Sequence, residues 1–158
     1  MLVGEQPGND EDLAGAPFVG PAGRVLDAAL DAAGIDRDMI FVTNAVKHFK
    51  FKPRGKRRLH ERPNAAEIEA CSVWSEAERK LVKPELVVAL GATAIRSLLK
   101  RAASVSSVRG RIVQMPDGGR MLATIHPSFL LRIRVKDDRI REQRRFVSDL
   151  RKARRAVE

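Results

Sequence analysis

The sequence is poor in several residue types whose abundance marks particular classes of protein. It has no tyrosine, one tryptophan and six phenylalanines in 158 residues, which argues against an open platform of aromatic rings for single-stranded nucleic acid. Its one cysteine, Cys71, has no partner for an internal disulfide. No apolar run approaches the ~18 residues that cross a bilayer, and the first residues lack the basic and apolar regions of a signal peptide. We therefore expect a soluble, cytoplasmic protein.

Basic residues, in contrast, are in excess. The chain has 30 Lys and Arg against 20 Asp and Glu, a formal net charge of +10. Such a balance in a small protein favours a polyanionic partner, with nucleic acid the leading candidate. The length fits one domain over residues 1–158, and 44% apolar residues suffice for one core. We expect this domain to be a monomer.

Three apolar runs are typical of buried parallel strands: residues 40–46, 86–90 and 121–125. Residues 1–3 are interpreted as the end of a fourth, central strand, so we expect the chain to begin inside that strand. The segment MPDGG, residues 115–119, predicts a hairpin turn that leads into the last strand. The sequence thus predicts a three-layer α/β/α sandwich with a four-stranded, mainly parallel sheet whose first strand is truncated.

Helical spacing alternates with these strands. Apolar residues recur with helical period over residues 21–33, and Gly34 supplies a stop. Asn64 and Glu67 form a capping-box pattern at the start of a second helix. A stripe along this helix is expected to be apolar and buried; its members are Ile68, Cys71, Trp74, Leu81 and Val82. A final helix begins near Lys136 and is dense in arginine on its outer face.

Residues 47–63, KHFKFKPRGKRRLHERP, interrupt this alternation. The segment is rich in Lys and Arg, contains two phenylalanines and has no periodicity typical of packing. We interpret it as a long basic insertion loop, and long loops inside compact domains are usually functional.

Four motifs lie at strand ends or in the loops that follow them: GEQPG at 4–8, PFVGPAGR at 17–24, TNAVK at 43–47 and HPS at 126–128. The carboxyl ends of parallel strands meet at one edge of a sheet, so the four can converge on one cleft. Together these motifs resemble those of the uracil-DNA glycosylase superfamily, of its bacterial iron–sulfur type. The segment KRRLH at 56–60 is similar to the distinctive loop of the UdgX branch, whose members trap DNA covalently. The resemblance covers nearly the whole chain.

A glycosylase extrudes uracil from the base stack and must hold its face and its edge. Under this resemblance the flat ring of Phe18 covers the face of the uracil ring. The amide of Asn44 can donate to uracil O4 and accept from N3–H, whereas cytosine presents the reverse pattern. The resemblance adds three further contacts to the base: Gln6, Gly8 and Ser128.

Catalytic roles also follow from the resemblance. Negative charge develops on uracil O2 as the glycosidic bond breaks, and His126 is in the position to donate a hydrogen bond to it. Glu5 and Asp12 are carboxylates that can stabilise the cationic sugar or hold a water molecule.

His60 is the most informative residue. The histidine that matches it in UdgX-type proteins attacks the sugar C1′ after uracil leaves and stays bonded to it. The neighbouring Lys56, Arg57 and Arg58 favour its neutral, nucleophilic form. These three cations and Arg132 are also expected to bind DNA phosphates.

A 4Fe-4S cluster is implied by the family, which holds it partly through an N-terminal cysteine pair. That pair has no counterpart here, and the two other ligand positions match His48 and Cys71. Two ligands do not hold a cubane cluster. The alternative for Cys71 is a buried apolar residue on its helix.

Three functions remain open at this point. The first is excision of uracil from DNA, preferably single-stranded, with covalent capture of the abasic product by His60. The second is a conventional multiple-turnover uracil-DNA glycosylase, in which His60 is a loop residue. The third is a non-catalytic fragment that binds uracil-containing DNA. The resemblance implies a bacterial cytoplasmic protein that is associated with the nucleoid when it acts.

Overall fold

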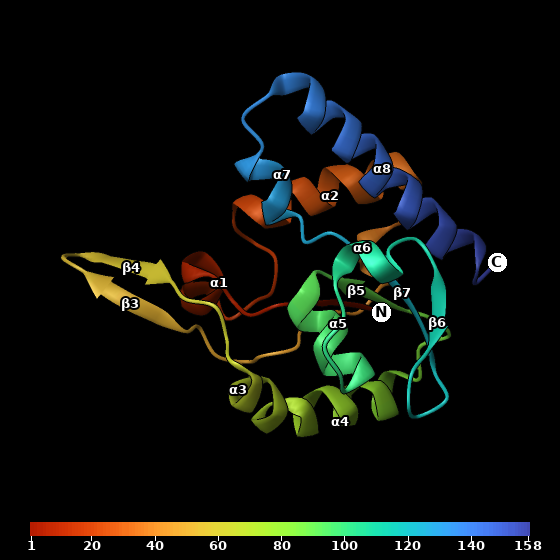
Figure 1. Ribbon diagram of the computed structural model, residues 1–158, viewed down its shortest axis with the longest axis horizontal. Helices are drawn as coiled ribbons and strands as arrows, with labels where there is room; N and C mark the ends of the chain where they lie inside the picture. The colour runs from red at the N-terminus through yellow and green to blue at the C-terminus, as the bar shows by residue number, and fades with distance from the viewer.

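The computed structural model describes residues 1–158 and centres on one mixed β-sheet (Figure 1). Its strands lie in the spatial order β2-β1-β5-β7-β6. The bounds of these strands are Leu2–Gly4 for β1, Val42–Asn44 for β2, Val87–Leu90 for β5, Ile112–Gln114 for β6 and Arg120–Thr124 for β7. Neighbours are parallel except for β6 and β7, which form an antiparallel hairpin.

The sheet has one strand more than the sequence predicted. The turn at residues 115–119 is confirmed, because Gln114 pairs with Arg120 across it. The strand before that turn, β6, was not counted because its apolar residues are too few to mark a buried strand, and Ile112 is exposed. The short β1 is an interior strand that pairs with β2 on one side and β5 on the other, but the central strand of the five is β5.

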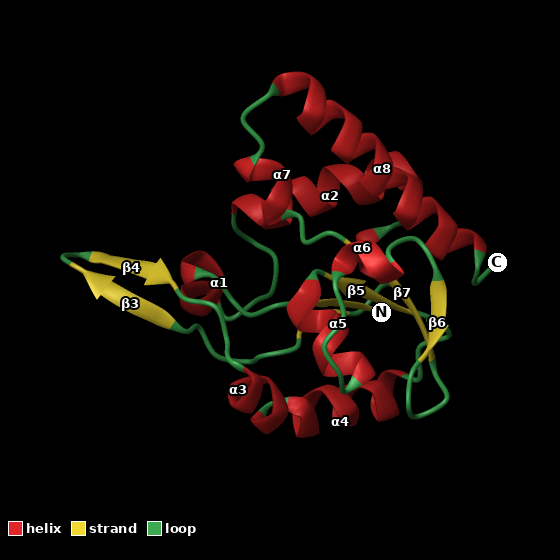
Figure 2. Ribbon diagram, in the orientation of Figure 1, coloured by secondary structure: helices red, strands yellow, loops and turns green.

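Helices cover both faces of the sheet, which confirms the predicted α/β/α layering (Figures 1 and 2). Helices α2 and α8 pack together on one side, whereas α3, α4 and α5 lie on the other. The bounds of the helices are Asn9–Ala14 for α1, Pro21–Ala33 for α2, Ala65–Ala70 for α3, Ser72–Val82 for α4, Ala92–Leu99 for α5, Val105–Val108 for α6, Ser128–Arg132 for α7 and Lys136–Arg155 for α8, with a 3-10 turn at Arg37–Met39. No helix has the length and apolarity that a membrane crossing requires.

Alternation along the strands divides the core between the two faces. In β5, Val88 joins the cluster under α2 and α8, whereas Val87 and Ala89 join the cluster under α5. Successive side chains of a strand point to opposite faces, so a strand buried on both faces is apolar throughout. This explains why the run at residues 86–90 was recognisable from sequence.

The predicted helix after Asn64 is interrupted. Its capping box is present, since Asn64 Oδ1 accepts from the Glu67 backbone N–H at 2.9 Å, but α3 ends at Ala70 and α4 begins at Ser72. The interruption turns the predicted stripe away from the core, so Trp74 and Leu81 are exposed. Ile68 and Cys71 are buried as expected.

The basic segment 47–63 is not a structureless loop. It contains strands β3 (Phe51–Arg54) and β4 (Arg57–His60), which pair in antiparallel register and project from the body of the protein (Figure 1). We call these two strands the β3–β4 hairpin. The register pairs Phe51 with His60, which places His60 at the end of the hairpin nearest the sheet.

Candidate active site

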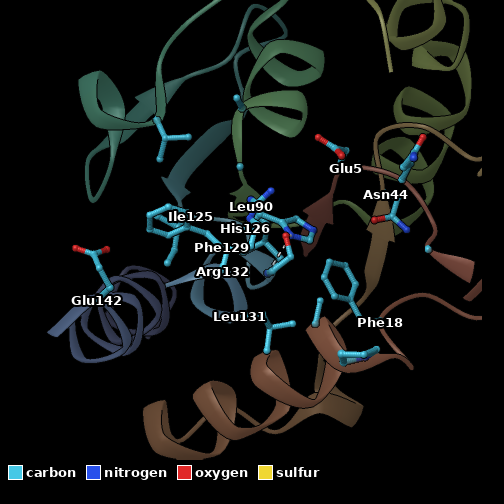
Figure 3. A pocket seen from close by; sticks show the side chains of 18 of the residues that line it. Glu5, Phe18, Asn44, Leu90, Ile125, His126, Phe129, Leu131, Arg132 and Glu142 are labelled. Atoms are coloured by element: carbon cyan, nitrogen blue, oxygen red, sulfur yellow. Dashed lines mark hydrogen bonds between the residues drawn. The ribbon is translucent and has the colours of Figure 1, made fainter. Parts of the chain in front are cut away.

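A large cavity lies at the carboxyl ends of the parallel strands, where the sequence motifs were expected to converge. Side chains from the ends of β1, β2 and β7 line it together (Figure 3). His60, at the end of β4, lines it as well. Eight of the nine residues that the sequence predicted to be catalytic or base-binding are among its lining residues: Glu5, Gln6, Gly8, Phe18, Asn44, His60, His126 and Ser128. We call this space the cavity.

Gly4 allows two of these side chains to meet over the end of β1. A Cβ at this position would stand 2.5 Å from Asn44 Oδ1 and 2.5 Å from the Phe18 ring. No protein group hydrogen bonds to the Asn44 amide, although the residue is only 6% exposed. An amide that is unpaired in a partly buried site is available to a ligand. The sequence analysis placed Gly4 in the GEQPG motif but did not predict that it makes room for Asn44 and Phe18.

Phe18 is held in an uncommon backbone conformation. Its φ is 54°, in the left-handed region that side chains other than glycine rarely adopt. Arg37 fixes the segment by donating from Nη2 to the Phe18 carbonyl at 3.3 Å. The ring is buried and lies 5.7 Å from the His126 ring, tilted by 31°. Such a residue persists only where the surroundings enforce it, and such positions cluster at functional sites.

His126 follows β7, and the start of α7 fixes its tautomer. The backbone N–H of Ser128 donates to Nδ1 at 3.2 Å, so Nδ1 is an acceptor. The neutral ring therefore carries its proton on Nε2. Ser128 Oγ also lies 2.8 Å from Nδ1, so this residue orients His126, although it was predicted to contact a base. Burial, the largest cause, lowers the pKa of His126 to about 4 and keeps the ring neutral.

Acid is expected to destabilise the fold through His126. Its pKa of about 4 lies below the ordinary 6.5, so the unfolded chain takes up this proton at a higher pH than the folded chain. The resulting stability is intact above about pH 6.5 and is lost as the pH falls toward about 4. We expect the melting temperature to fall between about pH 7 and about pH 5, and to fall much less in His126→Gln. Melting temperatures are measured by circular dichroism. An equal fall of the melting temperature in both proteins would contradict this prediction.

Glu5 joins the hairpin to the sheet. Its Oε1 lies 3.1 Å from His60 Nε2, and its Oε2 accepts from Thr93 Oγ1 at 2.6 Å. Burial alone raises the pKa of this carboxyl, but hydrogen bonds from His60 and Thr93 outweigh burial and lower the pKa to about 2. Glu5 is therefore a carboxylate at neutral pH. Arg62 Nε lies farther off, 3.9 Å from Oε2.

The environment of His60 differs from the one expected from its sequence neighbours. The expectation that cations favour its neutral form took account only of Lys56, Arg57 and Arg58. In the folded chain the closest charged group is the Glu5 carboxylate, which comes from a segment 55 residues away in sequence. Long-range contacts of this kind leave no signal in the local sequence.

Gln6 and Gly8 form hydrogen bonds within the protein that hold the chain segments around the cavity. Gln6 Nε2 donates to the carbonyls of Lys50 at 3.2 Å and Glu61 at 3.0 Å, and Gln6 Oε1 accepts from the Lys50 N–H. Its amide, predicted to contact a base, is thus occupied by both ends of the hairpin segment. The Gly8 N–H donates to Glu11 Oε2 at 3.2 Å. Both residues line the cavity.

Arg58 is engaged within the protein, although it was predicted to bind phosphate. It donates to Asp12 Oδ2 at 2.6 Å and to Asn9 Oδ1 at 2.8 Å, which ties the hairpin to α1. Its guanidinium also lies 5.1 Å from the ring centroids of both Phe49 and Phe51. Asp12, a predicted catalytic carboxylate, is paired with Arg58 and does not line the cavity.

The other predicted phosphate ligands lie in two places. Lys56 and Arg57 are exposed on the β3–β4 hairpin and form no ion pairs. Arg132, at the end of α7, lines the cavity, and no carboxylate pairs with it. The structure therefore separates the predicted cations into a hairpin pair and a cavity residue.

The residues present do not fit a four-ligand iron–sulfur cluster. His48 is exposed, whereas Cys71 is buried against Val46 and Ile68. Nowhere in the chain do three His, Cys, Asp or Glu side chains gather in a way that could hold a metal ion. A cubane cluster normally takes four ligands.

Comparisons with known proteins agree with this arrangement. The model of the uracil DNA glycosylase superfamily matches residues 1–151. The type-4 uracil-DNA glycosylase of Thermotoga maritima is 37% identical over 155 residues, which cover 97% of this chain and 74% of that protein. The type-4 uracil-DNA glycosylase of Pyrobaculum aerophilum is 37% identical over 139 residues, or 84% of this chain and 67% of that protein. The chain belongs to the uracil DNA glycosylase superfamily.

Proposed function

We propose that this protein excises uracil from DNA, preferably single-stranded, and stays bonded to the abasic product through His60. The observation that carries the proposal is that His60 reaches the same cavity as Phe18, Asn44 and His126, with its Nε2 held 3.1 Å from Glu5. All of these residues belong to the same chain and lie in the sequence between β1 and α7. The proposal thus needs no second subunit and fits a single glycosylase domain over residues 1–158.

Asn44 and Phe18 recognise the base. The free amide of Asn44 donates to uracil O4 and accepts from N3–H, a pattern that cytosine reverses. Phe18 covers one face of the ring at the bottom of the cavity, where Gly4 leaves room for both side chains. A site built to hydrogen bond its substrate rejects mismatched analogues strongly, because its own polar groups are then left unpaired.

His126 stabilises the leaving group. As the C1′–N1 bond breaks, its electron pair moves onto the base and charge gathers on O2. The Nε2–H of a neutral His126 donates to this oxygen, and the donation strengthens as charge develops. The lowered pKa of His126 keeps this form populated at neutral pH.

His60 then attacks the sugar. A ring nitrogen of the neutral imidazole forms a bond to C1′, and the uracil anion has already left with the glycosidic electron pair. The alkylated ring is an imidazolium, and its remaining proton is transferred to the departing uracil anion, which leaves as neutral uracil. The Glu5 carboxylate orients the ring beforehand and offsets its positive charge until that proton has left. The bond to C1′ in the deprotonated adduct breaks only by expelling an imidazole anion, which is a poor leaving group, so the adduct persists.

This capture is the property of the UdgX branch, to which we assign the chain on the segment from Lys56 to His60. No step requires an iron–sulfur cluster, which the His48 and Cys71 pair does not fit.

The test is to incubate the protein with a single-stranded oligonucleotide containing one uracil and to analyse it on a denaturing gel. We expect a slow-migrating protein–DNA band and one free uracil per adduct, with neither product from the thymine-containing oligonucleotide of the same sequence. Release of more uracil than protein without a band identifies the conventional glycosylase. Absence of both products identifies the binding fragment.

Arg58 is expected to position His60, because both lie on β4 and Arg58 ties that strand to α1. Arg58→Ala should slow adduct formation on the order of 10-fold, since small displacements of a reacting group are costly. Uracil release should stay close to that of the parent protein. Arg57→Ala is the matched control, because Arg57 is adjacent, exposed and unpaired. Equal slowing by both variants would indicate a general loss of charge instead.

A further inference from the structure

The cavity is larger than one extruded nucleoside requires. Its volume is about 1620 Å³, whereas pockets for compact organic ligands are about 300 to 1,000 Å³. Figure 3 shows its two ends: Glu5, Asn44 and Phe18 lie at one, and Glu142 of α8 lies at the other. His126 and Phe129 lie between them. The proposed function accounts for the first end only.

The second end is a groove between α6 and α8. Six of its lining residues define what we call the α6–α8 groove: Ser106, Arg109, Gly110, Arg145, Ser148 and Lys152. Its back wall is an ion network in which Arg109 donates to Glu142 at 2.7 Å and to Asp149 at 2.8 Å. The walls are thus polar and fixed to the core, and the groove is continuous with the uracil end of the cavity.

The charge of this groove is only partly neutralised. Arg109 is paired with two carboxylates and Arg145 is paired with Glu142 at 2.5 Å. Lys152 forms no ion pair, and neither does Arg132 farther along the cavity. Two cations without partners therefore lie along the path from the uracil end to the groove.

Gly110 keeps the space beside Lys152 open. Its φ is +67°, and a Cβ there would stand 3.3 Å from Lys152 Nζ and 3.0 Å from Asp149 Oδ1. The Ser148 hydroxyl, four residues before Lys152 and therefore one helical turn away, faces the same groove. An ammonium with a nearby hydroxyl and no carboxylate partner is suited to a phosphate group.

We propose that the α6–α8 groove is a second DNA subsite, which holds the backbone of the strand as it leaves the uracil end of the cavity. Lys152 pairs with a phosphate of this flanking segment, Ser106 and Ser148 donate to its oxygens, and Arg132 contacts the phosphate between the two ends. The inference rests on the proposed function, because a strand whose uracil lies against Phe18 must leave the cavity along one of its walls. The continuity of the walls favours DNA over a separate anion.

The probe is single-stranded DNA containing 2′-fluoro-2′-deoxyuridine, whose glycosidic bond resists cleavage, so that binding is measured without capture. A trinucleotide with the analogue in the centre is compared with oligonucleotides extended to about ten nucleotides on the 5′ or the 3′ side. Fluorescence anisotropy should show that one of the two extensions tightens binding to the native protein. Lys152→Ala should weaken binding of that extended oligonucleotide by about 3- to 10-fold and leave the trinucleotide unchanged.

Salt dependence gives an independent readout. Losing one phosphate contact should reduce the slope of log Kd against log salt by about 0.7 for the extended strand. Arg144→Ala is the matched control, because Arg144 is exposed on the same helix, forms no ion pair and does not line the cavity. Equal effects of the two variants, or an equal loss for the trinucleotide, would overturn the inference. Uracil release from natural substrate is measured separately, so failure of the proposed function remains distinguishable from failure of the groove.

Discussion

A His60→Ala variant should form at least about 10³-fold less covalent adduct than the parent protein, because the atom that bonds to C1′ is removed. Uracil release should continue, since Asn44, Phe18 and His126 are untouched. The released strand then carries an alkali-labile abasic site, which cleaves on heating in base. Denaturing gels measure the amount of covalent adduct, and strand cleavage after base treatment measures the abasic product that was not captured.

His48→Ala is the matched control for this experiment. His48 is an exposed histidine of the same basic segment, and it does not line the cavity. Its adduct yield should equal that of the parent protein. An adduct that survives in His60→Ala would show that another nucleophile captures the sugar, and the role assigned to the β3–β4 hairpin would be wrong.

Replacing Asn44 by aspartate should reduce uracil excision by about 10⁴-fold. The carboxylate keeps one acceptor but replaces the amide donor, so it repels uracil O4 instead of binding it. The same change creates an acceptor for the exocyclic amine of cytosine. We therefore expect a weak release of cytosine in acid, where a protonated carboxyl can also donate to cytosine N3. Chromatography of the released bases measures both products.

Asn64→Asp serves as the control for this substitution. Asn64 undergoes the same chemical change at the start of α3, where an aspartate caps a helix equally well. Its melting temperature and uracil release should match those of the parent protein. If Asn44→Asp released uracil as fast as the parent protein, the Asn44 amide would have no role in recognising the base.

The sequence predicted the parts of this fold that depend on local pattern. The strand at residues 86–90 is apolar at each position because both of its faces are covered, and Gly34 ends α2 in the left-handed conformation expected of it. The β3–β4 hairpin was missed because its strands are exposed and are stabilised by contacts such as Arg58 with Phe49. Periodicity does not record a pairing of this kind.

The site was predictable to the same extent. Residues predicted to face the ligand, such as Asn44 and His126, do line the cavity. Residues that act on other side chains were missed or given another role. Thr93 supports Glu5 from 88 positions away, and Ser128, which also lines the cavity, orients His126. A motif identifies which residues matter together, whereas the division of work among them requires coordinates.

The amide of Gln6 has a mechanical consequence for capture. It donates hydrogen bonds to the carbonyls of Lys50 and Glu61, so the two ends of the β3–β4 hairpin are anchored at one residue. His60 is adjacent to this anchored end, whereas the cationic tip is at the opposite end of the hairpin. A displacement of the tip would therefore change the position of the anchored end much less than that of the tip itself. We therefore expect His60 to keep its position beside Glu5 when the tip of the hairpin contacts DNA.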